Sequence, residues 1–142
     1  MIRALTLLGT PSVTLLALAL DLLTRHKLYS RRERTALLLF AAVASLILYS
    51  STLGYLPFDL YRVGFSPWAP IALALMAMAI APRSLAIAAT ALLALVAYDV
   101  PLFRSVNLFD AALDPILGIV AIGWAVGAAF RALLANQPAP AP

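Results

Sequence analysis

Five long runs of apolar residues divide the chain, and short polar segments separate them. The apolar runs span residues 4–24, 35–53, 67–81, 85–100 and 115–134. The segment 24–34 after the first run is strongly basic, whereas the segment 54–68 after the second is rich in aromatic residues. Apolar runs of this length form helices that are buried in protein or cross a membrane. The pattern therefore predicts an all-α fold in which the five runs are the main helices.

Polar residues and prolines mark the ends of these predicted helices. Three helix starts place a capping side chain before a proline, which has no N–H group to leave unpaired. These pairs are Thr10-Pro11, Ser66-Pro67 and Asp114-Pro115. Ser30 and Glu33 have the spacing of a capping box at the start of the second helix. Pro82 and Pro101 end the third and fourth helices, because the residue before a proline disfavours helical geometry.

The composition assigns the protein to a class. Of its 142 residues, 64% are hydrophobic and 11% are charged, and the mean hydropathy is +0.99. Soluble domains carry about 45–50% apolar and about 25% charged residues. The composition predicts a polytopic α-helical integral membrane protein, with one transmembrane domain over residues 1–135 and a disordered Pro/Ala tail over 136–142.

Helix lengths and arginine positions predict the topology. The fifth run would be ~30 Å long, which matches a bilayer, but the third and fourth would be only ~22–24 Å. We therefore expect about five transmembrane helices, of which the third and fourth either cross a thinned bilayer or form a hairpin. The segment 24–34 holds five of the ten basic residues, which places it in the cytoplasm. The N-terminus is then outside and the C-terminus inside.

The same features predict a location. A multi-pass chain that prefers arginine to lysine and is rich in Ala and Leu is typical of the inner (cytoplasmic) membrane of a bacterium with a GC-rich genome. The basic excess is concentrated in one loop, so it indicates topology and a contact with the lipid bilayer rather than a nucleic-acid partner.

This topology gathers polar residues at the outer face. The candidate cluster consists of Asp59, Arg62, Arg104, Asn107, Asp110 and Asp114. Carboxylates that converge are suited to a hard cation or to general acid–base chemistry. The alternative is that Asp114 caps the helix that begins at Pro115, while the other charges form pairs near the lipid headgroups. On the capping interpretation, Asp110 remains unexplained, facing Asp59 across two short loops.

Asp21 is the one acidic residue inside an apolar run. A carboxylate in a membrane span is costly to bury, and this makes Asp21 a candidate intramembrane acid. If the first helix begins near Ala4, Asp21 lies near its cytoplasmic end and pairs with Arg25. If the helix begins at Pro11, Asp21 moves toward the middle of the membrane.

Small residues on the fifth helix predict close helix packing. Gly118 begins one stripe of small residues, and Gly123 and Gly127 form a GxxxG pattern on the opposite side. We expect neighbours on both sides of this helix, and a homo-oligomer or other membrane subunits as partners.

The residue inventory restricts the chemistry. The chain has no cysteine and one histidine, His26, so thiolate sites and bis-histidine haem are excluded and no metal or cofactor is expected. Motifs of nucleotide binding, zinc proteases and serine hydrolases are missing from the sequence. The sequence favours a non-enzymatic subunit or accessory factor of a membrane complex. The alternatives are a transporter or channel subunit with Asp21 as the coupling acid, and an enzyme or binder for a lipid-linked substrate that uses Asp59, Asp110 and Asp114.

Overall fold

The computed structural model describes residues 11–24, 27–100 and 106–135, and these residues contain helices and no strand. Its elements are α2 (Val13–Leu23), α3 (Arg31–Thr52), the short 3-10 helix η1 (Leu60–Phe65), α4 (Trp68–Ile80), α5 (Leu85–Asp99), α6 (Leu108–Ala112) and α7 (Pro115–Ala135). The all-helical prediction is confirmed. The elements η1 and α6 lie in the polar segments, where the apolar pattern predicts no helix.

Local capping starts α2 and α3. The predicted capping box is present at α3, where Ser30 Oγ accepts the Glu33 N–H and the Glu33 carboxylate accepts the Ser30 N–H. At α2 the cap is Ser12, whose side chain accepts the N–H of Leu15 at 3.2 Å. The predicted cap Thr10 lies outside the described residues.

The start of α4 departs from the prediction. Its cap position is Pro67, which has no side-chain acceptor, and Ser66 Oγ accepts the N–H of Trp68 at 3.3 Å instead. As predicted, α4 ends just before Pro82. Pro101, the predicted stop after α5, lies outside the described residues.

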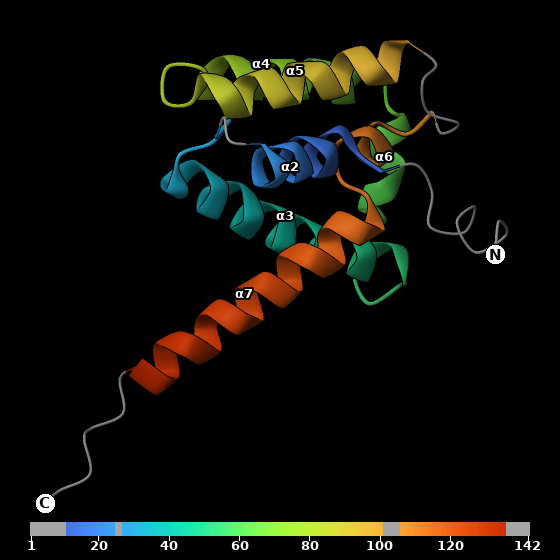
Figure 1. Ribbon diagram of the computed structural model, residues 1–142. Helices are drawn as coiled ribbons and strands as arrows, with labels where there is room; N and C mark the ends of the chain where they lie inside the picture. The colour runs from blue at the N-terminus through green and yellow to red at the C-terminus, as the bar shows by residue number, and fades with distance from the viewer. Residues whose placement is uncertain (1–10, 25–26, 101–105, 136–142) are drawn as a thin grey trace, which may run out of the picture.

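Two packed groups of helices make up the body (Figure 1). The antiparallel helices α4 and α5 form a hairpin that contacts α2 and α6, whereas α3 packs on α7 and η1. The core between them contains large and small apolar side chains, among them Leu18, Leu38, Ala41, Leu117 and Ala121. One end of the body carries the start of α3 and the α4–α5 turn, and the other carries η1, α6 and the start of α7 (Figure 1).

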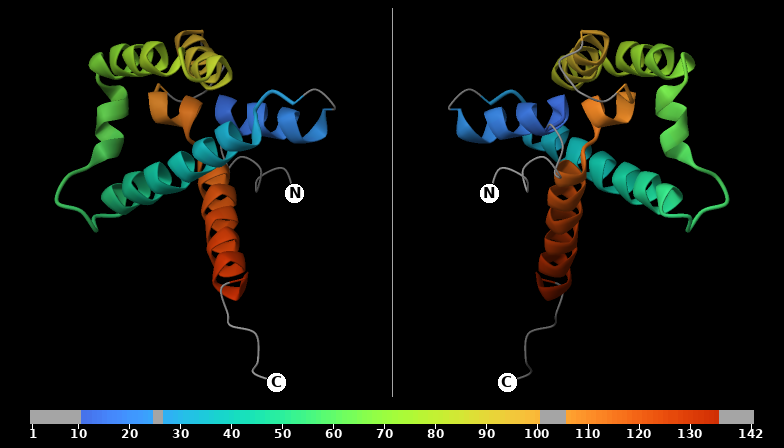
Figure 2. Two further views of the ribbon diagram at one scale, coloured as in Figure 1. Left: turned by 90° about the vertical axis from the view of Figure 1, so that its left-hand side faces the viewer. Right: turned by 90° about the vertical axis from the view of Figure 1, so that its right-hand side faces the viewer.

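The helix α7 leaves the body after about its first three turns. Leu117, Gly118 and Ala121 are buried, Ile122, Trp124 and Ala125 still pack against the core, and the rest of the helix points away from the other elements (Figure 2). A Cβ atom at Gly118 would lie 2.9 Å from Ser45 Oγ on α3, so the glycine permits this close crossing. A Cβ at Gly123 would meet nothing within 4 Å, and one at Gly127 would meet only the side chain of Arg131 at 3.5 Å. The expected neighbour on the GxxxG side is therefore not another element of the described chain.

Two helices, α3 and α7, are long and apolar enough to cross a membrane, by length and composition alone. The apolar helices α2, α4 and α5 are shorter, with 11, 13 and 15 residues. The structure thus supports two candidate spans and does not confirm five. The predicted tail at 136–142 lies outside the described residues.

Candidate functional site

The predicted outer-face cluster is divided into separate hydrogen-bonded contacts. Tyr61 lies between two of its acids: the backbone N–H of Tyr61 donates to Asp59 at 3.0 Å, and its hydroxyl reaches both carboxylate oxygens of Asp110 at 2.9 and 2.8 Å. Asp59 thereby caps η1. The unexplained role of Asp110 is now clear, since this carboxylate joins α6 to η1 through Tyr61.

Asn107 joins the same two elements from inside. The side chain of Asn107 is 1% exposed; it accepts the N–H of Phe109 at 2.9 Å and donates to the carbonyl of Tyr61 at 2.8 Å. It lies so close to Gly64 that a Cβ atom there would come within 1.9 Å of Asn107 Oδ1. Asn107 is therefore a cap and a structural tie between η1 and α6.

Asp114 performs the predicted cap and a second task. Its Oδ1 accepts the N–H of Leu117 at 2.8 Å, which starts α7, and its Oδ2 accepts the N–H of Ser12 at 2.6 Å, at the start of α2. The carboxylate is 2% exposed. Because two helix N-termini converge on it, their positive dipole ends stabilise its charge. This acid is engaged in holding two helices together.

The two arginines of the predicted cluster add no described contact with its acids. Arg62 is exposed on η1 and makes no ion pair with the described acids, and Arg104 lies outside the described residues. Within the described ranges, no group of three His, Asp or Glu side chains is placed to hold a metal ion.

Asp21 lies in a buried polar contact at the end of α2. The helix does start late, at the cap Ser12, yet Asp21 remains in its last turn because α2 ends at Leu23. Its carboxylate accepts the N–H of Tyr29 at 3.0 Å and forms an ion pair with Arg34, with Nε at 2.8 Å and Nη2 at 2.7 Å. The predicted partner Arg25 lies outside the described residues.

The ring of Tyr29 extends this contact to α5. Tyr29 is 2% exposed, and its hydroxyl lies 2.5 Å from Thr90 Oγ1. Thr90 donates its own proton to the carbonyl of Ala86, so Tyr29 is the donor in this pair. Burial raises the pKa of Tyr29 above its ordinary value of 10.0, and the nearby Asp21 carboxylate adds to the rise.

We expect Tyr29→Phe to lower the free energy of unfolding by about 1 kcal/mol at neutral pH, the usual contribution of one hydrogen bond. The folded state favours the neutral phenol, so its contribution is complete below pH 10 and is lost as the pH rises above that value. The difference between wild type and variant should therefore shrink in alkaline buffer. Thermal unfolding at pH 7 and pH 11 measures it, and a constant difference would contradict this assignment.

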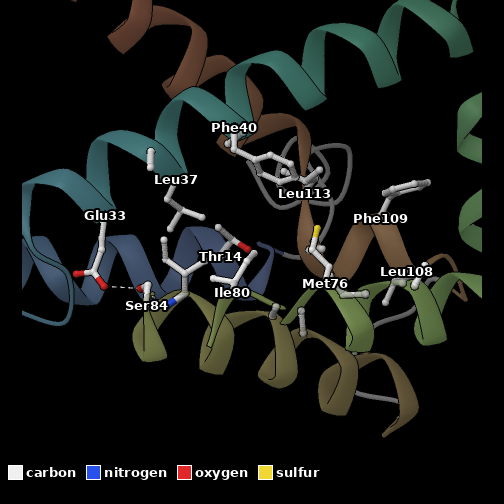
Figure 3. A pocket seen from close by; sticks show the side chains of 18 of the residues that line it. Thr14, Glu33, Leu37, Phe40, Met76, Ile80, Ser84, Leu108, Phe109 and Leu113 are labelled. Carbon is white, nitrogen blue, oxygen red and sulfur yellow. Dashed lines mark hydrogen bonds between the residues drawn. The ribbon is translucent and has the colours of Figure 1, made fainter. Parts of the chain in front are cut away.

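An apolar groove lies between α3 and the α4–α5 hairpin (Figure 3). It has a volume of about 690 Å³, and Thr14 of α2 and Leu113 after α6 lie in its floor. Three lining residues, Phe40, Val63 and Met76, are 51%, 48% and 38% exposed, so the groove opens to the surroundings along its side.

Apart from Thr14 in the floor, the polar residues that line the groove lie at one end, at the start of α3 and the α4–α5 turn. Glu33 accepts a short hydrogen bond from the hydroxyl of Ser84, and Ser84 Oγ accepts the N–H of Ile87 (Figure 3). Glu33 thus connects the N-termini of α3 and α5. Arg32 and Arg83 line the same end and are exposed.

Sequence reasoning missed this groove, although it held one indication. The predicted five-span topology would put Arg32 and Arg83 on the same side of the membrane, and the structure brings both to one end of the groove. Most of the remaining lining is apolar and comes from several separate elements, so its common side becomes visible only when they are assembled.

The fold and the groove define a small all-helical protein with two candidate membrane-spanning helices and an open apolar groove with a basic end. Comparisons with protein-family models, with curated proteins and with solved structures found no match.

Proposed function

We propose that the protein is a multi-pass, non-enzymatic subunit or accessory factor of a bacterial inner-membrane complex, and that α7 is the helix that contacts its partner. The observation that carries the proposal is the departure of α7 from the body after Ala125. A helix that stabilised only its own chain would pack along more of its length. The partner is a second copy of this chain or another membrane subunit.

The exposed part of α7 has the chemistry of a helix–helix interface in lipid. Val126, Phe130 and Leu133 are 65%, 62% and 68% exposed. Gly123 and Gly127 are open to their surroundings, and small residues at this spacing let a second backbone approach closely. We place the basic end of the body in the cytoplasm, with the N-terminus outside and the C-terminus inside.

No described contact favours the two alternatives. Asp21, the proposed coupling acid of a transporter, is bound by Arg34 and by the N–H of Tyr29. The acids proposed for a lipid-linked substrate are engaged apart from one another, since Asp59 caps η1, Asp110 binds Tyr61 and Asp114 binds two helix starts.

We expect Gly123→Leu combined with Gly127→Leu to weaken association by about tenfold or more, which corresponds to ~1.4 kcal/mol. Both side chains have room in the single chain, so the fold should persist. The measurement is the mass of the complex in a mild detergent, by native mass spectrometry. Wild type should exceed the 15.1 kDa of one chain, and the double variant should approach it.

The matched control is Ala132→Leu, which places a leucine on the side of α7 opposite Gly123 and Gly127 and away from Val126, Phe130 and Leu133. It should associate as wild type does. A wild-type chain that is monomeric and brings no other subunit with it contradicts the proposal, as does a double variant that associates normally.

A further inference from the structure

The groove combines an apolar length with a basic end, and this combination matches one kind of ligand. We propose that it binds an acyl chain of an anionic phospholipid, with the phosphate group held by Arg32 and Arg83. The proposal goes beyond the function proposed above, because it concerns α3, α4 and α5 and does not depend on α7.

The apolar part of the groove is suited to a single hydrocarbon chain. Its lining extends from Arg32 to Ala41 on α3 and from Ala69 to Ile80 on α4, which is about 14 Å and about 17 Å at the helical rise. The volume of 690 Å³ lies within the range of about 300–1,000 Å³ that is usual for ligand sites. Phe40 and Leu37 cover one wall and Met76 and Ile80 the other (Figure 3).

The basic end carries a net positive charge among its described residues, because Arg32 and Arg83 line it together with a single carboxylate, Glu33. In the described part of the chain, the one ion pair within 4.0 Å joins Arg34 to Asp21, so no described carboxylate pairs with Arg32 or Arg83. The nearby Glu33 is already bound by the hydroxyl of Ser84 and the N–H of Ser30. Two guanidinium groups from different elements therefore flank the end of the groove, where an anion would complement them.

A phosphate ester attached to an acyl chain satisfies both parts of the groove. Arginine holds phosphate oxygens through two parallel hydrogen bonds, and it does so better than it holds a neutral headgroup. A free phosphate ion would leave the apolar walls uncovered, and an apolar helix would leave Arg32 and Arg83 unmatched. With the orientation proposed above, the headgroup would lie at the cytoplasmic leaflet, whose anionic lipids attract such basic residues.

The test compares two single-chain lipids that differ only in their headgroup. The full-length protein is stripped of lipid in detergent and titrated with lysophosphatidylglycerol or with a monoacylglycerol of equal chain length, which lacks the phosphate, and bound lipid is counted by native mass spectrometry. We expect lysophosphatidylglycerol to bind about tenfold more tightly, the factor that one charge-assisted hydrogen bond of ordinary strength supplies. Equal affinities would overturn the headgroup assignment.

The arginine variants locate the headgroup. Arg32→Gln with Arg83→Gln should remove the preference for the anionic lipid, whereas Arg31→Gln, one residue away and outside the groove lining, should keep it. All three residues are exposed, so these variants should unfold at the wild-type temperature. A double variant that retains the preference would overturn the proposal, and so would displacement of the lipid by millimolar glycerol phosphate, which carries the headgroup chemistry without the chain.

A second pair of variants locates the chain. Ala72→Trp fills the groove from α4 and should weaken the binding of both lipids, whereas Ile71→Trp adds the ring outside the lining and should not. Unchanged binding in a folded Ala72→Trp protein would place the lipid elsewhere and overturn the proposal.

Discussion

Gly64→Ala should lower the free energy of unfolding by about 2–4 kcal/mol. The added Cβ would lie 1.9 Å from Asn107 Oδ1 and 2.7 Å from the ring of Phe109, so Asn107 must move. Its hydrogen bonds to the Tyr61 carbonyl and the Phe109 N–H then break in a buried position. Thermal unfolding in one fixed detergent measures the loss.

The matched control for this substitution is Gly123→Ala. A Cβ at Gly123 meets nothing within 4 Å, and alanine stabilises a helix by up to about 1 kcal/mol relative to glycine. In a detergent that keeps the chain monomeric, so that the proposed α7 interface does not contribute, Gly123→Ala should therefore unfold at or above the wild-type temperature. Equal effects of the two substitutions would show that the contact between η1 and α6 is not as tight as described.

Asp21→Ala is the second substitution with a large expected effect, about 2–4 kcal/mol of destabilisation. It removes the partner of Arg34 and leaves the buried N–H of Tyr29 unpaired. Breaking a buried ion pair costs about 3–5 kcal/mol. We place the value lower because the Arg34 side chain is 27% exposed and gains some hydration. Unfolding by heat at neutral pH measures this change.

A double variant tests whether the loss comes from the ion pair. Asp21→Ala combined with Arg34→Met should be less destabilised than the sum of the single variants, because neither charge remains buried alone. Thermal unfolding of Asp21→Asn separates a structural role from a role in transport. If Asp21 were a coupling acid, this variant would fold normally and lose flux, whereas the contacts described here predict that it loses stability.

Helix positions followed from the sequence because the determinants are local. The capping box at Ser30 and Glu33 and the cap at Asp114 each lie within three residues of the N–H groups that they satisfy. The contact of Asp21 with Arg34 did not follow, because Arg34 lies 13 positions further along the chain and reaches the carboxylate from the start of α3. The predicted contact with Arg25 lies outside the described residues and stays a prediction.

The division of the outer cluster depends on contacts between distant segments. Tyr61 binds Asp110 across 49 positions and also binds Asp59. The predicted topology has these two acids facing each other, and it gives no indication that a tyrosine lies between them. The groove is non-local in the same way, because its lining residues come from α2, α3, η1, α4, α5 and α6. Sequence periodicity on one helix carries no information about such a shared space.

The hydrogen bond between Ser12 and Asp114 spans 102 positions. At the usual rate of synthesis, roughly 5–20 residues per second, the ribosome takes on the order of 5–20 s to proceed from one residue to the other. During that interval, the N–H group of Ser12 must be satisfied by water or by another partner. The first described helix of this chain thus reaches its final environment only when the last one begins to emerge.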